Sequence, residues 1–292
     1  MENTRYDFLP IIARKPLELP NGARVAVYVA VAIEYWAIDS QEWAVPGAKI
    51  PPPNLFEYGP RDYGNRIGLW RIMEVLDRHN IKATAFFNSD ICKHYPIIAK
   101  ECKKREWEFC AHSTSNAVLL AGKTEAEERE IIRTTIDVIT KAAGRRPIGW
   151  IGAALAETFN TPDILAEEGI KYVSDWVCDD QPFPLKVKAG NLISMPYTLD
   201  LNDIPAFLMH GLTPSQFCDM VIAQFDTMYR EGATQPRVMS IGIHHFLMGQ
   251  AYRIAALDKA VQYMKGFKDV WFATSEEIAK WYYEKYMGIK LP

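Results

Sequence analysis

The uninterrupted apolar run VAVYVAVAI at residues 25–33 is the feature that most limits how this chain can fold. A membrane-spanning helix needs about 20 consecutive apolar residues, so the run is too short to cross a bilayer. A short, continuous apolar run is instead typical of a strand that is buried on both faces. The chain must therefore place this strand inside a core, which favours a globular protein with a substantial buried sheet.

Short apolar runs alternate with helical patterns along the rest of the chain, and this alternation predicts parallel βαβ units. Capping boxes at Thr124 with Glu127 and at Thr213 with Gln216 indicate two helix starts. A barrel and an open doubly wound sheet both fit. We favour a (β/α) barrel, because no G-x-G-x-x-G motif follows the first strand. Predicted strands lie at 25–33, 83–87, 107–111, 147–151, 171–175, 192–196, 238–243 and 270–273, and predicted helices at 64–79, 95–105, 124–143, 161–168, 213–231, 252–265 and 275–285.

The 292 residues are expected to form one domain, residues 1–292, that contains a proline-rich loop insertion around 37–63. The segment VPGAKIPPPN lies at the centre of this insertion. Such an excursion is either a functional lid or assembly arm, or a plain surface insertion.

Charge and cysteine content exclude several classes of protein. The net charge is −3 and no block of like charges occurs, which argues against binding to nucleic acid or to a membrane surface. The five cysteines form no C-x-x-C pair, and the first ten residues have no signal-peptide pattern. We therefore expect a cytoplasmic protein with reduced thiols.

Reactive side chains follow several of the predicted strands. In a barrel, catalytic groups stand at the C-terminal ends of strands. Glu34, His112 and His244 end the first, third and seventh predicted strands. His245 follows His244, and strand alternation sends the two histidines to opposite sides. The alternative is that these residues are simply the polar starts of loops.

A carboxylate and two histidines supply the proton transfers that a hydrolase needs. No G-x-S-x-G elbow is present, so a serine hydrolase is disfavoured. Direct attack by water is the more economical mechanism.

Several segments, taken in order, resemble the polysaccharide deacetylase superfamily. Within it, the chain is most similar to the cytosolic branch of cyclic-amide hydrolases, which contains cyclic imide hydrolases and metal-independent allantoinases. The resemblance implies a distorted (β/α) barrel of seven or eight strands. It is carried by YGNRIGLWRIMEVLDRHNIKATAFFN (63–88), EFCAHSTSN (108–116), RRPIGWIGAALAET (145–158), YVSDWVCDDQPF (172–183) and MSIGIHHFLMGQAYRIAALDKAVQYM (239–264).

The chain departs from the family pattern at the metal-binding positions. Typical deacetylases have two adjacent aspartates after the first strand, whereas this chain has only Glu34. They also have a second histidine after H-S/T, where this chain has Ser115 or Asn116. Glu34 and His112 alone would hold zinc weakly, so we expect no tightly bound cofactor. His244 matches the family's late histidine, which serves as the general acid.

Without a metal, the substrate carbonyl must already be electrophilic, and a cyclic imide fits because its nitrogen is shared between two carbonyls. We therefore expect the chain to open a small cyclic amide, most plausibly a cyclic imide, to its half-amide. The resemblance gives Glu34 the role of base, His112 that of orienting the water or carbonyl, and His244 that of acid. Expected substrate-binding residues are Tyr35, Trp36, Ser113, Asn116, Trp150, Trp176 and Asp180.

Three other readings stay open at this stage: an allantoinase, a metal-dependent N-deacetylase of a sugar or peptidoglycan-type substrate, and a non-catalytic protein that binds a small ligand. We also expect a homo-oligomer, with interfaces in the apolar segment 43–58 and the aromatic helix near the C-terminus.

Overall fold

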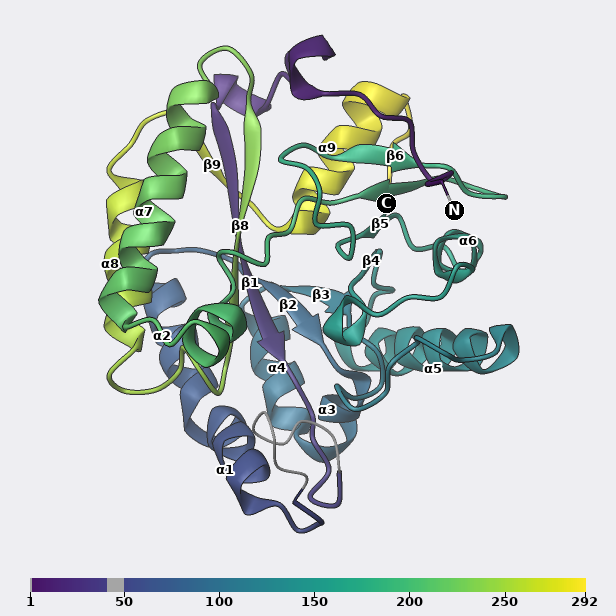
Figure 1. Ribbon diagram of the computed structural model, residues 1–292, viewed down its shortest axis with the longest axis vertical. Helices are drawn as coiled ribbons and strands as arrows, with labels where there is room; N and C mark the ends of the chain where they lie inside the picture. The colour runs from purple at the N-terminus through teal and green to yellow at the C-terminus, as the bar shows by residue number, and fades with distance from the viewer. Residues whose placement is uncertain (1, 41–49) are drawn as a thin grey trace.

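Strand β1 (Val25–Ile33) pairs with three other strands of the sheet, and every one of its residues is buried (Figure 1). In this computed structural model, which describes residues 2–40 and 50–292, β1 runs parallel to all of its neighbours. Strand β8 (Arg237–His244) pairs with it along one edge. On the other edge, β9 (Val270–Phe272) pairs with the first half of β1 and β2 (Thr84–Phe87) with the second half.

The described residues form one nine-stranded sheet whose order along the main path is β6-β7-β5-β4-β3-β2-β1-β8. The sheet curls into a half-barrel within a single α/β domain, which confirms the predicted distorted (β/α) barrel. The free edge of β8 is covered by loop segments, since Gly242 N donates to Leu201 O and Asn202 forms a bridge with Gly242. The remaining strands are β3 (Glu108–Ala111), β4 (Gly149–Trp150), β5 (Tyr172–Val173), β6 (Phe183–Leu185) and β7 (Leu192–Ser194).

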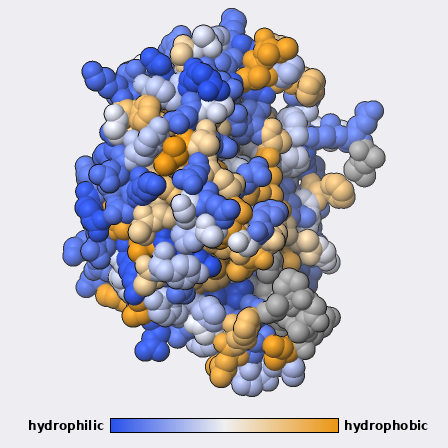
Figure 2. Space-filling view, turned by 60° about the vertical axis from the view of Figure 1, so that its left-hand side comes forward, coloured by the Kyte–Doolittle hydropathy of each residue, from blue (hydrophilic) through white to orange (hydrophobic). Residues whose placement is uncertain are grey.

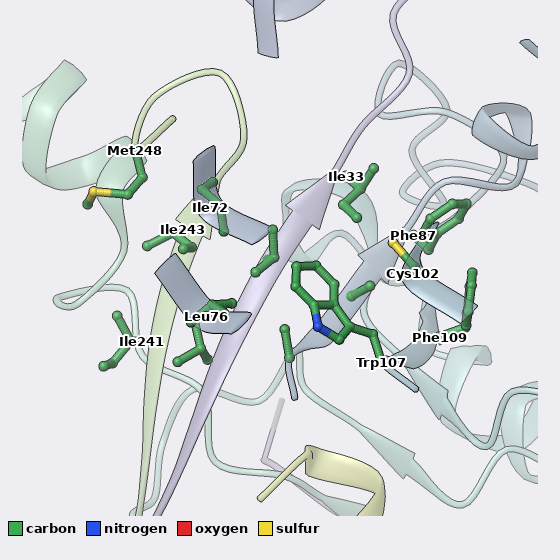
Figure 3. Packing of buried hydrophobic residues seen from close by; sticks show 14 of the residues in the cluster. Ile33, Ile72, Leu76, Phe87, Cys102, Trp107, Phe109, Ile241, Ile243 and Met248 are labelled. Carbon is green, nitrogen blue, oxygen red and sulfur yellow. The ribbon is translucent and has the colours of Figure 1, made fainter. Parts of the chain in front are cut away.

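Strand alternation divides the core into an outer and an inner layer. Val25, Val27 and the other odd-numbered residues of β1 pack outward against the helices. Figure 3 shows part of this outer layer, where Ile243 lies near Ile72 and Leu76 of α2 (Figure 3). The even-numbered residues of β1, including Tyr28, face the interior of the half-barrel.

Helices cover the convex side of the sheet, with α2, α7 and α8 over β1 and β8. The capping boxes predicted at Thr124 and Thr213 are both present, and a third begins α9 at Thr274. The helices are α1 (Leu55–Tyr63), α2 (Leu69–Arg78), α3 (Ser89–His94), α4 (Pro96–Lys104), α5 (Glu125–Ala143), α6 (Thr161–Glu167), α7 (Pro214–Glu231), α8 (Ile254–Lys265) and α9 (Ser275–Met287). Two π-helical segments, Gly64–Gly68 and Pro205–Met209, and three 3-10 turns, Ile11–Ala13, Pro20–Gly22 and Ala153–Leu155, complete the helical segments of residues 2–40 and 50–292.

The predicted loop around 37–63 is too long. Its last part is helix α1, which begins at Leu55 and is capped by Asn54, whose side chain accepts a hydrogen bond from Glu57 N. The prolines before Asn54 and the proline inside α1 hid this helix in the sequence. The first part of the segment VPGAKIPPPN lies outside the described residues.

The prediction also missed β6 (Phe183–Leu185), which runs antiparallel to β7. It contains Pro184, a residue that strands tolerate mainly at the edge of a sheet. The chain therefore turns back after β5 instead of crossing over through a helix, and the sheet is mixed.

No helix in the described part of the chain is both long enough and apolar enough to cross a membrane. Exposed apolar side chains include Leu55 and Phe56 on α1, and Figure 2 shows hydrophobic atoms at the lower end of the molecule, where α1 lies (Figure 2). The predicted homo-oligomer stays a prediction, and part of the segment 43–58 lies outside the described residues.

Candidate active site

Glu34, His112 and His244 converge at the C-terminal ends of three strands. Each continues the even-numbered, inward-facing set of its strand, so all three enter the interior of the half-barrel. His244 Nε2 lies 3.4 Å from Glu34 Oε1, and His112 Nε2 lies 3.8 Å from the same oxygen. The structure thus brings the three predicted catalytic residues together around one carboxylate oxygen.

Glu34 is only 2% exposed and is held from several sides. Trp36 Nε1 lies 3.3 Å from Glu34 Oε2, and Asn65 Nδ2 donates to the Glu34 backbone oxygen. Burial by itself would raise the pKa of Glu34, but His244 and His112 outweigh it and hold that pKa well below its usual range. Glu34 is therefore an ionised carboxylate that can accept a proton.

His244 is held by Asp203, a residue that the sequence analysis missed. The Asp203 carboxylate accepts hydrogen bonds from His244 Nδ1, at 2.6 Å, and from the His244 backbone N–H, at 2.8 Å. Burial would lower the pKa of His244, but Asp203 and Glu34 outweigh it and raise this pKa to about 10. The imidazole is therefore protonated at neutral pH. Its Nε2–H points toward Glu34.

His245 points the other way, as alternation requires. Its Nδ1 contacts Ala32 O at 3.0 Å, and burial lowers its pKa to about 4, so it is a neutral structural histidine. The π-helical turn packs directly on it, and a Cβ added at Gly68 would lie 2.1 Å from His245 O. Glycine is needed here because the two backbones approach so closely. This contact keeps Asn65 beside Glu34.

His112 has a defined tautomer. Its Nδ1 lies 2.8 Å from Ile151 O, and because a carbonyl oxygen can only accept, Nδ1 carries the proton. The other ring nitrogen, Nε2, faces the carboxylate of Glu34. It can orient a water molecule through one of the hydrogens of that water.

The donor atoms here do not match the divalent-cation site that the resemblance implies for metal-dependent deacetylases. Within residues 2–40 and 50–292, no three His, Cys, Asp or Glu side chains are grouped so that they could hold a metal ion. His244 is protonated and bound to Asp203, which leaves Glu34 and His112, whereas a catalytic zinc takes three protein ligands. We therefore derive no step through a metal.

Two of the expected substrate-binding residues, Trp36 and Asn116, lie close in the chain to Glu34 and His112. Trp36 is buried beside Glu34 and carries the Arg61 guanidinium 4.1 Å above its ring. Asn116 follows His112 on the same loop, and its Oδ1 is buried without a hydrogen-bond partner in the described structure. Tyr35 follows Glu34 in the chain, but its ring stacks on His94 at 4.2 Å.

Three other expected substrate-binding residues, Ser113, Trp150 and Asp180, have different roles. Ser113 donates its hydroxyl to Val118 O at 2.8 Å, so that hydroxyl is already used within the loop. Trp150 is fully buried in the outer layer, because its register partner Ala111 also faces outward. The prediction that it lines the pocket is therefore wrong.

Asp180 was also placed wrongly. Its backbone oxygen accepts from Val238 N near the start of β8, whereas His244 ends that strand. Six residues of strand separate the two positions, or about 20 Å at 3.3 Å per residue. The reversal into β6 carries Asp180 to the opposite end of the sheet. Trp176, in contrast, stays near the strand ends, where it lines a cavity with Asp175 and Glu157.

Part of the chain is similar to a known protein family. Residues 55–173 match the family model "Polysaccharide deacetylase". The matched range contains His112, whereas Glu34, Asp203 and His244 lie outside it. A Schizosaccharomyces pombe protein named "Putative polysaccharide deacetylase" is 28% identical over 236 residues, which cover 75% of this chain and 73% of that protein.

Solved structures extend the likeness to nearly the whole chain. The crystal structure of a probable polysaccharide deacetylase from Pseudomonas aeruginosa PAO1 has a TM-score of 0.85 and 28% identity, covering 94% of this chain and 96% of the other. The PuuE allantoinase structure has a TM-score of 0.84 and 26% identity, covering 96% of this chain and 99% of the other. The fold is therefore that of the deacetylase family of hydrolases.

Proposed function

We propose that this protein is a hydrolase that opens the C–N bond of a small cyclic amide by direct attack of water. The observation that carries the proposal is the placement of an ionised carboxylate, Glu34, between His112 and a protonated His244. A base and an acid with separated pKa values are what amide hydrolysis requires.

The proposed reaction balances with these residues alone. Water, oriented by His112 Nε2, loses a proton to Glu34 as its oxygen bonds to the ring carbonyl carbon. The C–N bond then breaks, and His244 Nε2 gives its proton to the departing nitrogen. Because Glu34 Oε1 and His244 Nε2 are 3.4 Å apart, the proton can return from one to the other and restore the starting state.

A cyclic imide is the substrate class that we favour, because its carbonyl is electrophilic without help from a cation. The two-donor set at the site supports this choice, because it does not suit a tightly held metal. A second candidate is the ring of allantoin, which the likeness to PuuE allantoinase favours.

A substrate screen tests the proposal. Purified protein is incubated with succinimide, glutarimide, hydantoin, allantoin and N-acetylglucosamine, with and without a chelator, and ring opening or acetate release is followed by chromatography. We expect the imide rings to open and the rate to be insensitive to the chelator. Turnover of allantoin alone would select the second candidate. Release of acetate that depends on added zinc would contradict both candidates.

A further inference from the structure

Two acidic residues that line one cavity, the buried Asp175 and the half-buried Glu157, have no part in the reaction described above. Asp175 Oδ1 accepts a hydrogen bond from Gly152 N at 2.8 Å. His112 Nδ1 donates to Ile151 O at 2.8 Å. Ile151 O and Gly152 N belong to the same peptide group, which is planar and rigid. One peptide group therefore connects the Asp175 carboxylate to the His112 ring.

Through this peptide group, the negative charge of Asp175 can affect the protonation of His112 as well as the orientation of its ring. A carboxylate that accepts from a peptide N–H polarises that peptide and makes its carbonyl oxygen a better acceptor. Linked hydrogen bonds strengthen one another by roughly 10–30% per bond in a buried setting. The connection thus favours the form of His112 that has its proton on Nδ1.

Glu157 completes the arrangement by keeping a proton. Burial first, and the neighbouring Asp175 second, raise the pKa of Glu157 to about 10. Burial raises the pKa of Asp175 to about 6, opposed by its hydrogen bonds with Glu157 and Gly152. At neutral pH the pair holds one proton, on Glu157, and one negative charge, on Asp175.

The local geometry agrees with a shared proton. Glu157 Oε1 and Asp175 Oδ2 are both buried, and neither has a separate hydrogen-bond donor among the described residues. A neutral Glu157 that donates to Asp175 would satisfy both oxygens. The backbone at Gly152 leaves room for this pair, since a Cβ there would lie 3.1 Å from Asp175 Oδ2 and 2.9 Å from Ala156 O.

We propose that Asp175 and Glu157 are positioning residues for His112. Asp175 acts through the Ile151–Gly152 peptide to fix the tautomer and orientation of the imidazole, and Glu157 holds Asp175 in place as a neutral hydrogen-bond donor. The kinetic consequence rests on the proposed function, whereas the tautomer of His112 can be measured without any substrate.

The experiment compares Asp175→Asn, Glu157→Gln and Glu157→Ala, with Glu108→Gln as a control at a buried carboxyl group elsewhere in the interior. Side-chain 15N NMR reports which His112 nitrogen carries the proton, and succinimide hydrolysis gives kcat and KM. Asparagine at 175 can still accept from Gly152 N but lacks the charge. We expect it to shift His112 away from the pure Nδ1–H form and to lower kcat about 10- to 100-fold with KM little changed, as for other residues that orient an active group.

Glutamine at 157 donates as the neutral acid does, so we expect it to preserve the tautomer and most of kcat, whereas alanine at 157 loses both. If Asp175→Asn fails to fold, the comparison of Glu157→Gln with Glu157→Ala still tests the inference. An unchanged His112 spectrum in Asp175→Asn, or equal behaviour of the Gln and Ala variants at 157, would overturn the inference. A wild-type protein that opens no cyclic amide would instead remove the proposed function and leave the NMR test intact.

Discussion

The two ends of the half-barrel interior both contain a buried glutamate, and they hold it differently. At the C-terminal ends of the strands, the histidine nitrogens nearest to Glu34 Oε1 lie 3.4 Å and 3.8 Å away. At the opposite end, Glu108 Oε2 accepts from Thr84 Oγ1 at 2.9 Å, from Ser275 Oγ at 3.0 Å and from Glu276 N at 2.8 Å.

The difference separates a structural carboxyl group from a reactive one. Glu108 has its acceptor capacity filled by fixed donors, and burial, with Glu276 second, raises its pKa to about 7. Glu34 has long contacts to charged or chargeable groups and a pKa well below its usual range. A buried group whose partners stand at or beyond hydrogen-bond length can still take up a water or substrate, because its interactions are not complete.

Replacement of the reactive carboxylate should have the largest effect. Glu34→Gln keeps the shape but cannot accept a proton, so we expect kcat/KM to fall by about 10²- to 10⁴-fold, the usual range for a general base. Steady-state kinetics on the best substrate of the screen measures this. The melting temperature should fall, because the low pKa of Glu34 means that its charged form stabilises the folded state and the substitution leaves protonated His244 without this partner. Activity near the wild-type level would exclude Glu34 as the base.

The next largest effect is expected in the pH dependence of the rate, which is set by His244, the proposed general acid. The reaction needs protonated His244, whose pKa is about 10, so the pH profile should keep its activity up to that pH and fall above it. Asp203→Asn removes one of the two carboxylates that raise this pKa, so the alkaline limb should move to lower pH. Rates measured from pH 6 to 11 for both proteins check the shift. An alkaline limb that does not move would show that His244 is not the group that titrates.

The same pair affects stability. Because the folded pKa of His244 is above its ordinary value of 6.5, its contribution to stability is complete below that value and is lost as the pH rises through about 10. Denaturant titrations at several pH values should therefore show a loss of stability above neutral pH that is smaller in Asp203→Asn.

Replacement of Glu108, at the opposite end of the interior, should lower the stability of the protein without changing its catalytic rate. Glu108→Ala leaves the donors of Thr84, Ser275 and Glu276 without their buried acceptor, which costs on the order of 3 kcal/mol in unfolding free energy. Urea unfolding gives this value, and kinetics at low temperature gives the activity of the folded fraction. A large loss of kcat in a folded Glu108→Ala protein would contradict the division between the two ends.

The smallest effect is expected at Trp36. Trp36→Phe keeps a ring beneath Arg61 but removes the indole N–H that lies 3.3 Å from Glu34 Oε2. One long hydrogen bond to a charged group contributes about 1 kcal/mol, so kcat/KM should fall about fivefold. A change beyond about 100-fold would mean that Trp36 also contacts the substrate, since one such hydrogen bond cannot account for it.

The sequence by itself determined every strand of the described structure except β6, most of the helices and the three reactive strand ends. Hydrophobic runs and capping boxes are local signals, and strand alternation sends Glu34, His112 and His244 to the same face once the strands are parallel. These features need no knowledge of which distant segments meet, so they could be predicted.

Only the tertiary structure decided which residues support the site. Asp203 reaches His244 because the loop before it covers the free edge of β8, and Asp180 is carried away by the reversal into β6. Trp150 faces outward because of its register with Ala111. Pairing register and chain reversal depend on contacts between segments far apart in the sequence, and no local pattern encodes them.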